Sequence, residues 1–195
     1  MKTLFLDTTN GYLVIILQDD RVLLDSLQIW NHQKHTEKAT VLIDEMLTNH
    51  KLSWFDIDSL YLTVGPGSYT GIRVGITIAK TMKAVNETLQ VFVTNSLLLQ
   101  VGNKQAISVI NAKTDQFFVA VYDNFHPIVL EQVVTRNNLL LLKKEWKKFK
   151  LIEHYHRVDV VENFLQIKHL CKKVTNVDDL EPLYLKELHL KKHYE

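Results

Sequence analysis

A glycine-rich stretch at residues 64–75 constrains the fold of this chain more than any other part of the sequence. It holds four of the six glycines in the 195 residues. An apolar run at residues 60–64 predicts a buried strand before it, and the helical spacing of apolar residues at 72–84 predicts a helix after it. The glycines therefore fall in a tight strand-to-helix turn, where they allow positive φ angles and close approach of another backbone or an anion.

A turn of this kind can bind phosphate, because unpaired N–H groups lie beside the positive end of a helix dipole. Neither of the two common nucleotide-binding patterns fits this stretch. A P-loop needs Gly-Lys-Ser/Thr beginning five residues after its first glycine, but Thr70 and Ile72 follow Gly65 and Gly67 at that distance. A dinucleotide-binding fingerprint needs glycine where Thr70 stands. Two interpretations stay open, a structural turn and an anion site.

A strip of small residues runs along the predicted helix, since Gly71, Gly75 and Ala79 recur every fourth position. Glycine inside a helix costs about 1 kcal/mol relative to alanine, and close packing along the strip should offset that cost. We expect the strip to pack against another helix. That helix is either the amphipathic one predicted at residues 39–47, or one that belongs to another protein.

The rest of the chain shows strands followed by helices, twice over. The apolar patterns predict strands at 4–6, 12–18, 22–29, 91–93, 106–110, 116–122, 128–134 and 151–153, and further helices at 94–101, 138–150 and 158–171. This repetition predicts an α/β protein of two related halves. We place them at residues 1–104 and 105–195, the second being smaller, with a tail that packs back on the first.

Composition indicates an ordinary soluble globular protein, with 46% hydrophobic and 23% charged residues. No apolar run approaches membrane-spanning length, and the first residues lack the layout of a signal peptide, so we expect a cytoplasmic protein without a membrane partner. The single cysteine, Cys171, lies on the apolar side of a helix-like stretch, which favours a buried thiol over a nucleophile.

Charge is unevenly distributed along the chain. Residues 1–135 hold 10 Lys and Arg against 13 Asp and Glu, a net of −3, while residues 136–195 hold 13 against 9, a net of +4. The basic residues concentrate at 143–150. Two interpretations remain, a solvated helix face and an electrostatic footprint for RNA.

Several motifs in consistent order resemble one family over nearly the whole chain. They are Leu6-Asp7-Thr8-Thr9, His35, Gly65-Pro-Gly-Ser-Tyr-Thr-Gly-Ile-Arg-Val-Gly75, Thr94-Asn95-Ser96-Leu97, Ile110-Asn111-Ala112-Lys113 and Pro182-Leu183-Tyr184-Leu185-Lys186. Together they are similar to the bacterial tRNA threonylcarbamoyladenosine biosynthesis protein TsaB, or YeaZ, family. The resemblance implies the duplicated actin-like (ribonuclease H-like) ATPase fold, each half a mixed β-sheet with helices and the second half reduced.

The resemblance also implies a function. Members are non-catalytic partners of TsaD, the transferase that places threonylcarbamoyl on N6 of adenosine 37 in tRNAs reading ANN codons. An ATPase, TsaE, joins the system, so ATP is used by the assembly and tRNA is reached through it, with no cofactor held by this chain. A heterodimer is implied, and a homodimer in the absence of the partner stays open. The implied partner-facing residues are Leu42, Ile43, Met46, Gly65, Pro66, Gly67, Ser68, Tyr69, Thr70, Gly71, Arg73, Gly75 and Ala79.

The chain departs from the family pattern in its second half, which is shorter. Asn111-Ala112-Lys113 stands where the family has Asp-Ala-Arg, and Lys186 stands where it has Arg. These departures leave the role of the second half open.

The competing hypothesis is a stand-alone enzyme of the actin-like fold, an ATPase, kinase or metallopeptidase-like protein. Its nucleotide-proximal residues would be Asp7, Thr8 and Thr9 in the first hairpin turn. We predict no metal site, because the His-x-x-x-His spacing of the related transferase appears only at His189 and His193, close to the end of the chain.

Overall fold

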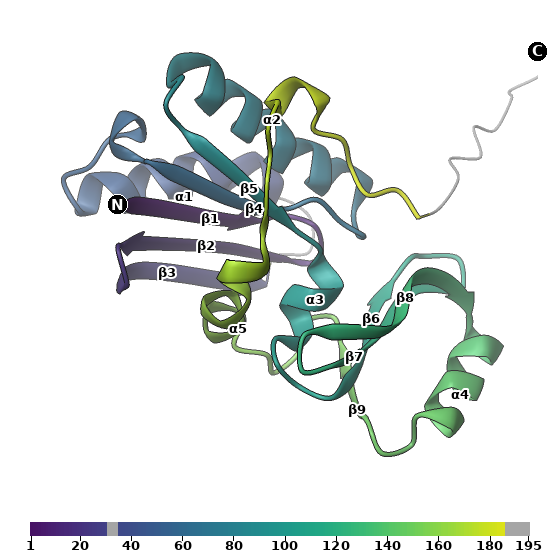
Figure 1. Cartoon of the computed structure of the whole chain (residues 1–195). Coiled ribbons are helices and arrows are strands. Elements are labelled where there is room, and N and C mark those ends of the chain that lie inside the picture. Colours follow the sequence, from purple (N-terminus) through teal and green to yellow (C-terminus); the bar gives the residue numbers. More distant parts are fainter. Residues whose placement is uncertain (31–34, 186–195) are drawn as a thin grey trace, which may run out of the picture.

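The computed structural model describes residues 1–30 and 35–185, without the side chains of 35–37 (Figure 1). Its strands form two mixed sheets, ordered β10-β5-β4-β1-β2-β3 and β8-β7-β6-β9. The strands are β1 Lys2–Asp7, β2 Tyr12–Asp19, β3 Val22–Trp30, β4 Ser59–Thr63, β5 Gln90–Thr94, β6 Ala106–Asn111, β7 Gln116–Asp123, β8 His126–Thr135, β9 Lys150–Glu153 and β10 Lys172–Lys173. The α-helices are α1 His35–Asn49, α2 Tyr69–Val85, α3 Ser96–Val101, α4 Arg136–Glu145 and α5 Val160–Ile167.

The first sheet is covered on both faces. Because side chains alternate along a strand, Leu4 and Leu6 of β1 pack into a core with α1 and α2, while Phe5 between them packs into a second core with α3 and α5. The continuous apolar run of β2 divides in the same way between the two cores. This explains why β2 lacks the apolar and polar alternation of a half-exposed strand.

The second sheet shares one of those cores. Ala106 and Phe118 lie in the same core as Phe5, so the facing surfaces of the two halves form one continuous apolar interior with α3 and α5. The opposite face of the second sheet packs under α4, through Leu139 and its neighbours. Helix α4 therefore lies at the end of the molecule away from α1 and α2 (Figure 1).

Both sheets follow one plan. In each, three antiparallel strands (β3-β2-β1 and β8-β7-β6) are extended by parallel pairing, from β1 to β4 and β5 in the first and from β6 to β9 in the second. The expectation of a duplicated actin-like α/β fold with a reduced second half is confirmed. The division at residue 104 stays a prediction; β10, which follows the second sheet in sequence, pairs with β5 of the first.

Two predicted helices are shorter than expected. The helix expected at 138–150 is α4, which ends at Glu145, because Trp146 and Phe149 turn into the core and Lys150 begins strand β9. The helix expected at 158–171 is α5, which Asp159 caps and which gives way to a 3-10 turn at Lys168–Leu170. Within residues 1–30 and 35–185, no helix is long and apolar enough to span a bilayer.

Candidate functional site

The glycine-rich turn lies directly against the first hairpin. The amide of Ser68 donates to the carbonyl of Thr9 at 2.5 Å, and the Thr8 hydroxyl donates to the carbonyl of Gly71 at 2.7 Å. A Cβ atom at Gly67 would lie 2.0 Å from the Thr9 carbonyl oxygen, and one at Gly71 would lie 1.9 Å from that of Thr8. These glycines are required because two backbones touch there, so no phosphate can approach them from that side.

The two glycines of the small-residue strip pack against this same hairpin and strand β4, and not against a helix. Beyond the Gly71 contact, a Cβ atom at Gly75 would meet the Thr8 hydroxyl at 3.1 Å and Leu62 of β4 at 3.8 Å. Ala79, the third member, is fully buried. The helix-to-helix interpretation of the two glycines is therefore wrong, and they hold α2 on the sheet of their own chain.

Asp7 lies at the centre of a buried polar cluster between the two halves. Its Oδ1 accepts hydrogen bonds from the Thr9 amide at 2.8 Å, the Thr9 hydroxyl at 2.7 Å and the Thr63 hydroxyl at 2.5 Å. Its Oδ2 accepts from the hydroxyl of Tyr155. A buried carboxylate is tolerated when donors surround it, and here hydroxyl and amide donors do so.

Tyr155 brings the second half onto Asp7. It lies between β9 and α5, is fully buried, and has a φ of 59°, in the left-handed region that side chains other than glycine rarely adopt. Its amide donates to the Gln100 side chain at 2.7 Å, which helps to hold that conformation. Burial and the neighbouring Asp7 charge raise the pKa of the Tyr155 hydroxyl well above its usual value, so it remains a donor. Nothing in the sequence pattern marked this residue.

The second hairpin turn, at residues 111–115, makes its polar contacts at the surface. Asn111 is exposed and its side chain accepts from the amide of Lys113, while Asp115 pairs with Arg136 at the surface. Within the described residues, no three His, Cys, Asp or Glu side chains converge as metal ligands. His189 and His193 lie outside that part of the chain.

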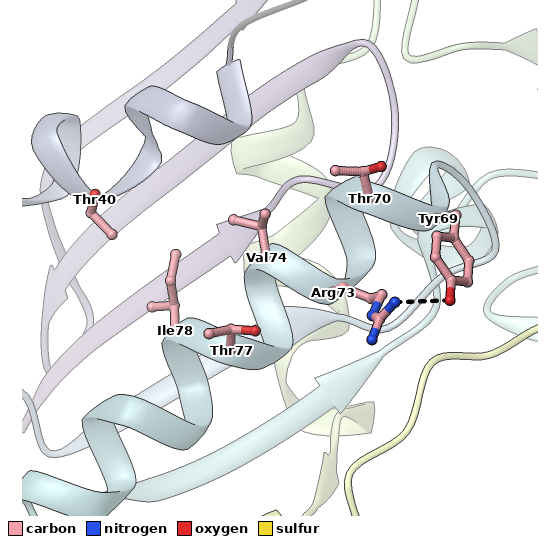
Figure 2. Close-up of a pocket in the computed structure, with 7 residues that line it drawn as sticks. All are labelled: Thr40, Tyr69, Thr70, Arg73, Val74, Thr77 and Ile78. Carbon is pink, nitrogen blue, oxygen red and sulfur yellow. Dashed lines mark hydrogen bonds between the residues drawn. The ribbon is translucent and has the colours of Figure 1, made fainter.

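An open groove of about 380 Å³ lies along the outer face of α2, beside α1 (Figure 2). Its lining mixes threonine hydroxyls, aliphatic side chains, one tyrosine and one arginine. These residues are Thr40, Tyr69, Thr70, Arg73, Val74, Thr77 and Ile78. Sequence reasoning missed Thr40, Val74, Thr77 and Ile78; the polar positions that alternate with the strip on α2 were the available signal.

Arg73 is the one cation in the lining of this groove, and aromatic rings hold it in place. Its Nη1 donates to the Tyr69 hydroxyl at 2.9 Å, and its guanidinium carbon lies 5.1 Å from the centre of the Tyr69 ring. The ring of Tyr184 stacks on Tyr69 at 5.3 Å, so the segment after Pro182 reaches the start of α2. That segment is fixed by the Leu183 amide, which donates to the carbonyl of Val64 at 2.7 Å.

The residues expected to face a partner divide into two groups. Ser68, Tyr69, Thr70 and Arg73 are exposed, and Leu42 and Gly67 are half-buried. The others are buried in their own chain: Ile43, Met46, Gly65, Pro66, Gly71, Gly75 and Ala79. The interface itself stays a prediction, but only the first group and the groove present side chains to another molecule.

Comparison with known proteins gives the family. The model described as "TsaD: tRNA N6-adenosine threonylcarbamoyltransferase" matches residues 30–175. An uncharacterized protein of Mycoplasma pneumoniae is 32% identical over 94% of both chains. The Bacillus subtilis protein named tRNA threonylcarbamoyladenosine biosynthesis protein TsaB is 27% identical over 72% of this chain and 63% of its own length. The chain belongs to the TsaB/YeaZ family.

The structural comparison agrees with this family assignment. YeaZ from Pseudomonas aeruginosa superposes with a TM-score of 0.71 at 14% identity, covering 94% of this chain and 99% of that one. At that identity the likeness concerns the fold. The TsaB/YeaZ fold therefore extends over both sheets, including the reduced second one.

Proposed function

We propose that this protein is a non-catalytic subunit of the system that forms threonylcarbamoyladenosine in tRNA, and that it acts by binding a TsaD-like transferase. The reaction would modify N6 of adenosine 37 in tRNAs that read ANN codons. Membership of the TsaB/YeaZ family supports the pathway, as does the name carried by the Bacillus subtilis relative.

The main support for a non-catalytic role is that hydrogen bonds occupy both carboxylate oxygens of Asp7. In an actin-like enzyme the acidic residue of the first hairpin turn faces the metal and nucleotide. Here both carboxylate oxygens accept hydrogen bonds from Thr9, Thr63 and Tyr155. A bound nucleotide would have to displace Tyr155, which is fully buried. We therefore favour a role without chemistry of its own.

The docking surface proposed for the transferase is the α1–α2 groove. Its exposed threonines and aliphatic side chains suit a pair of packed helices, and Arg73 suits an acidic residue opposite. Val41, which is 54% exposed, is a further apolar side chain at the surface of α1. A TsaE-like ATPase and tRNA would then join through the complex, in the cytoplasm, with ATP used by the assembly. The same face is open to self-association when the partner is absent.

A bulky residue inside the groove tests this surface. Thr77 is exposed, so Thr77→Arg adds volume and charge without entering the core, whereas a large residue at Gly75 would collide with Thr8. We expect Thr77→Arg to weaken co-elution with the transferase at least about tenfold, the effect of losing roughly 1.4 kcal/mol of binding. Thr175→Arg, at an exposed threonine after β10, is the matched control.

Unchanged binding by Thr77→Arg, with an unchanged melting temperature, would contradict the docking surface. The competing enzyme hypothesis has its own measurement. If the purified chain alone hydrolyses ATP or peptide, and Asp7→Asn abolishes that turnover, the non-catalytic role is wrong.

A further inference from the structure

Four exposed lysines follow one another where α4 ends, and we call them the basic edge: Lys144, Lys147, Lys148 and Lys150. Two neighbouring cations are already paired, Arg136 with Asp115 at 2.7 Å and Lys143 with Glu153 at 3.7 Å. None of the four lysines has an ion pair within 4.0 Å among the described residues. Their charges are therefore available to another molecule.

The basic edge is held on a rigid turn. Trp146 and Phe149, which flank Lys147 and Lys148, are half-buried and pack against the core beneath α4, with their ring centres 5.0 Å apart. The Trp146 amide donates to the carbonyl of Leu142, and the Phe149 amide donates to that of Trp146, both at 2.9 Å. Lys147 and Lys148 thus project from a turn whose backbone is fixed by its aromatic residues, which lowers the entropy lost on binding.

The local charge exceeds what helix stability explains. Residues 136–153 carry six Lys and Arg against two Glu, a net of +4, while residues 1–135 carry −3. A lysine in the last turn of a helix stabilises the negative end of the dipole, which accounts for Lys144. It does not account for Lys147, Lys148 and Lys150, which come after the helix has ended at Glu145.

We propose that the basic edge binds the phosphate backbone of a folded RNA. Rigidly placed lysines without base-reading partners are suited to phosphates, which bind through charge and without regard to sequence. This inference rests on the proposed function in one respect, because the proposed function identifies the RNA as tRNA. Helix α4 lies at the end of the molecule away from α1 and α2, so RNA and the transferase can be bound at once (Figure 1).

An anionic membrane is the other surface that basic helices contact. Leu140 and Leu141 on α4 are 51% and 61% exposed, which is the apolar component such contact needs. They stand before the basic edge, however, and three of its four lysines lie beyond the helix. Most of the charge therefore lies beyond the helix and not along its apolar face, and this favours RNA.

The test compares two triple variants of the full chain that lose the same net charge. One is Lys147→Gln, Lys148→Gln and Lys150→Gln. The other, at exposed lysines elsewhere, is Lys51→Gln, Lys172→Gln and Lys173→Gln. Affinity for a tRNA transcript is measured over a range of salt concentrations, with the chain alone and with its complex with the transferase.

We expect the basic-edge triple to lower the slope of log affinity against log salt by about 2 to 3, because each phosphate contact contributes about 0.7 to 0.9. Its tRNA affinity should fall about tenfold, while the control triple should keep the salt dependence and the tRNA affinity of the wild-type chain. Retained binding to the transferase supports the proposal. Equal effects of the two triples would overturn it, since net charge alone would then explain the binding.

Two further outcomes separate this inference from others. If the basic-edge triple loses binding to phosphatidylserine-containing vesicles but keeps its tRNA affinity, the surface is a membrane one and the RNA proposal is wrong. If the wild-type chain fails to bind the transferase, the proposed function is wrong. The tRNA measurement on the chain alone still shows whether the basic edge binds RNA.

Discussion

Tyr155 donates a hydrogen bond from its hydroxyl to Asp7 Oδ2 across 148 positions of sequence. This contact joins the two halves of the molecule at the hairpin turn where the competing enzyme hypothesis would place a nucleotide. Both residues are fully buried, and within residues 1–30 and 35–185 no cation donates a hydrogen bond to Asp7. The contact therefore stabilises the junction of the two halves. It is also the main support for a role without catalysis.

Replacing Tyr155 with phenylalanine should destabilise the protein by about 1.5–3 kcal/mol, the range for a hydrogen bond to a charged group. The ring stays, and only the donor to Asp7 is lost. Urea denaturation measures the change, and Tyr184→Phe at an exposed tyrosine should stay within about 0.5 kcal/mol of wild type. Equal stability of the two variants would show that Asp7 does not depend on Tyr155.

Alanine at Gly71 and at Gly75 should have different consequences, although both residues lie in α2. A Cβ atom at Gly71 would lie 1.9 Å from a backbone oxygen that cannot move away easily, so Gly71→Ala should cost about 1–3 kcal/mol or more. At Gly75 the nearest atom is the Thr8 hydroxyl at 3.1 Å, and the gain in helix propensity of about 1 kcal/mol offsets the crowding. Thermal unfolding of the two variants measures both changes in stability. A Gly71→Ala protein as stable as wild type would refute the close packing of hairpin and turn.

Gln100→Leu should destabilise the chain by at least about 2 kcal/mol, because it leaves buried groups without partners. The fully buried Gln100 side chain donates to Ser108, to the carbonyl of Val109 and to that of Ile152, and accepts from the Tyr155 amide. Gln166→Leu, on the partly exposed side of α5, serves as control. A small effect of Gln100→Leu in denaturant would mean that water replaces these bonds.

Cys171 should react slowly with iodoacetamide while the protein is folded. Burial raises the pKa of its thiol to about 12, so the thiolate fraction at pH 8 should be roughly a thousandfold lower than in the unfolded chain. The unfolded state releases this proton first as pH rises, so the thiol's contribution to stability is lost between its ordinary pKa and about 12. Mass spectrometry with and without urea gives the rates, and equal rates would contradict burial of the thiol.

Local patterns were sufficient for most of the fold. The apolar runs of β1, β2, β4 and β6 depend on burial within two cores, and burial is what hydrophobic periodicity reports. The end of α4 was harder to predict, because the Lys-rich sequence after Glu145 continues to favour a helix. Only the tertiary packing of Trp146 and Phe149 stops it.

The site was harder to predict than the fold because its contacts cross long sequence distances. The sequence pointed to the glycines but not to their partner, since a helix and a hairpin backbone demand small residues equally. Tyr155 lies in a stretch without periodicity, and its role depends on where β9 and Gln100 place it. Tyr184 reaches Tyr69 only because the chain returns to the first sheet.

Because the chain returns to the first sheet only after the second sheet has been made, the contacts of the first half become available in a fixed order during synthesis. Residues 1–104 leave the ribosome with every strand of the first sheet except β10, and with Asp7 lacking its donor from Tyr155. A nascent chain of that length also lacks the Leu183 amide that caps the Val64 carbonyl. The groove that is proposed to receive the transferase thus acquires its supporting contacts only after the segment around Leu183 has been made, so shorter nascent chains present an unfinished surface to the partner.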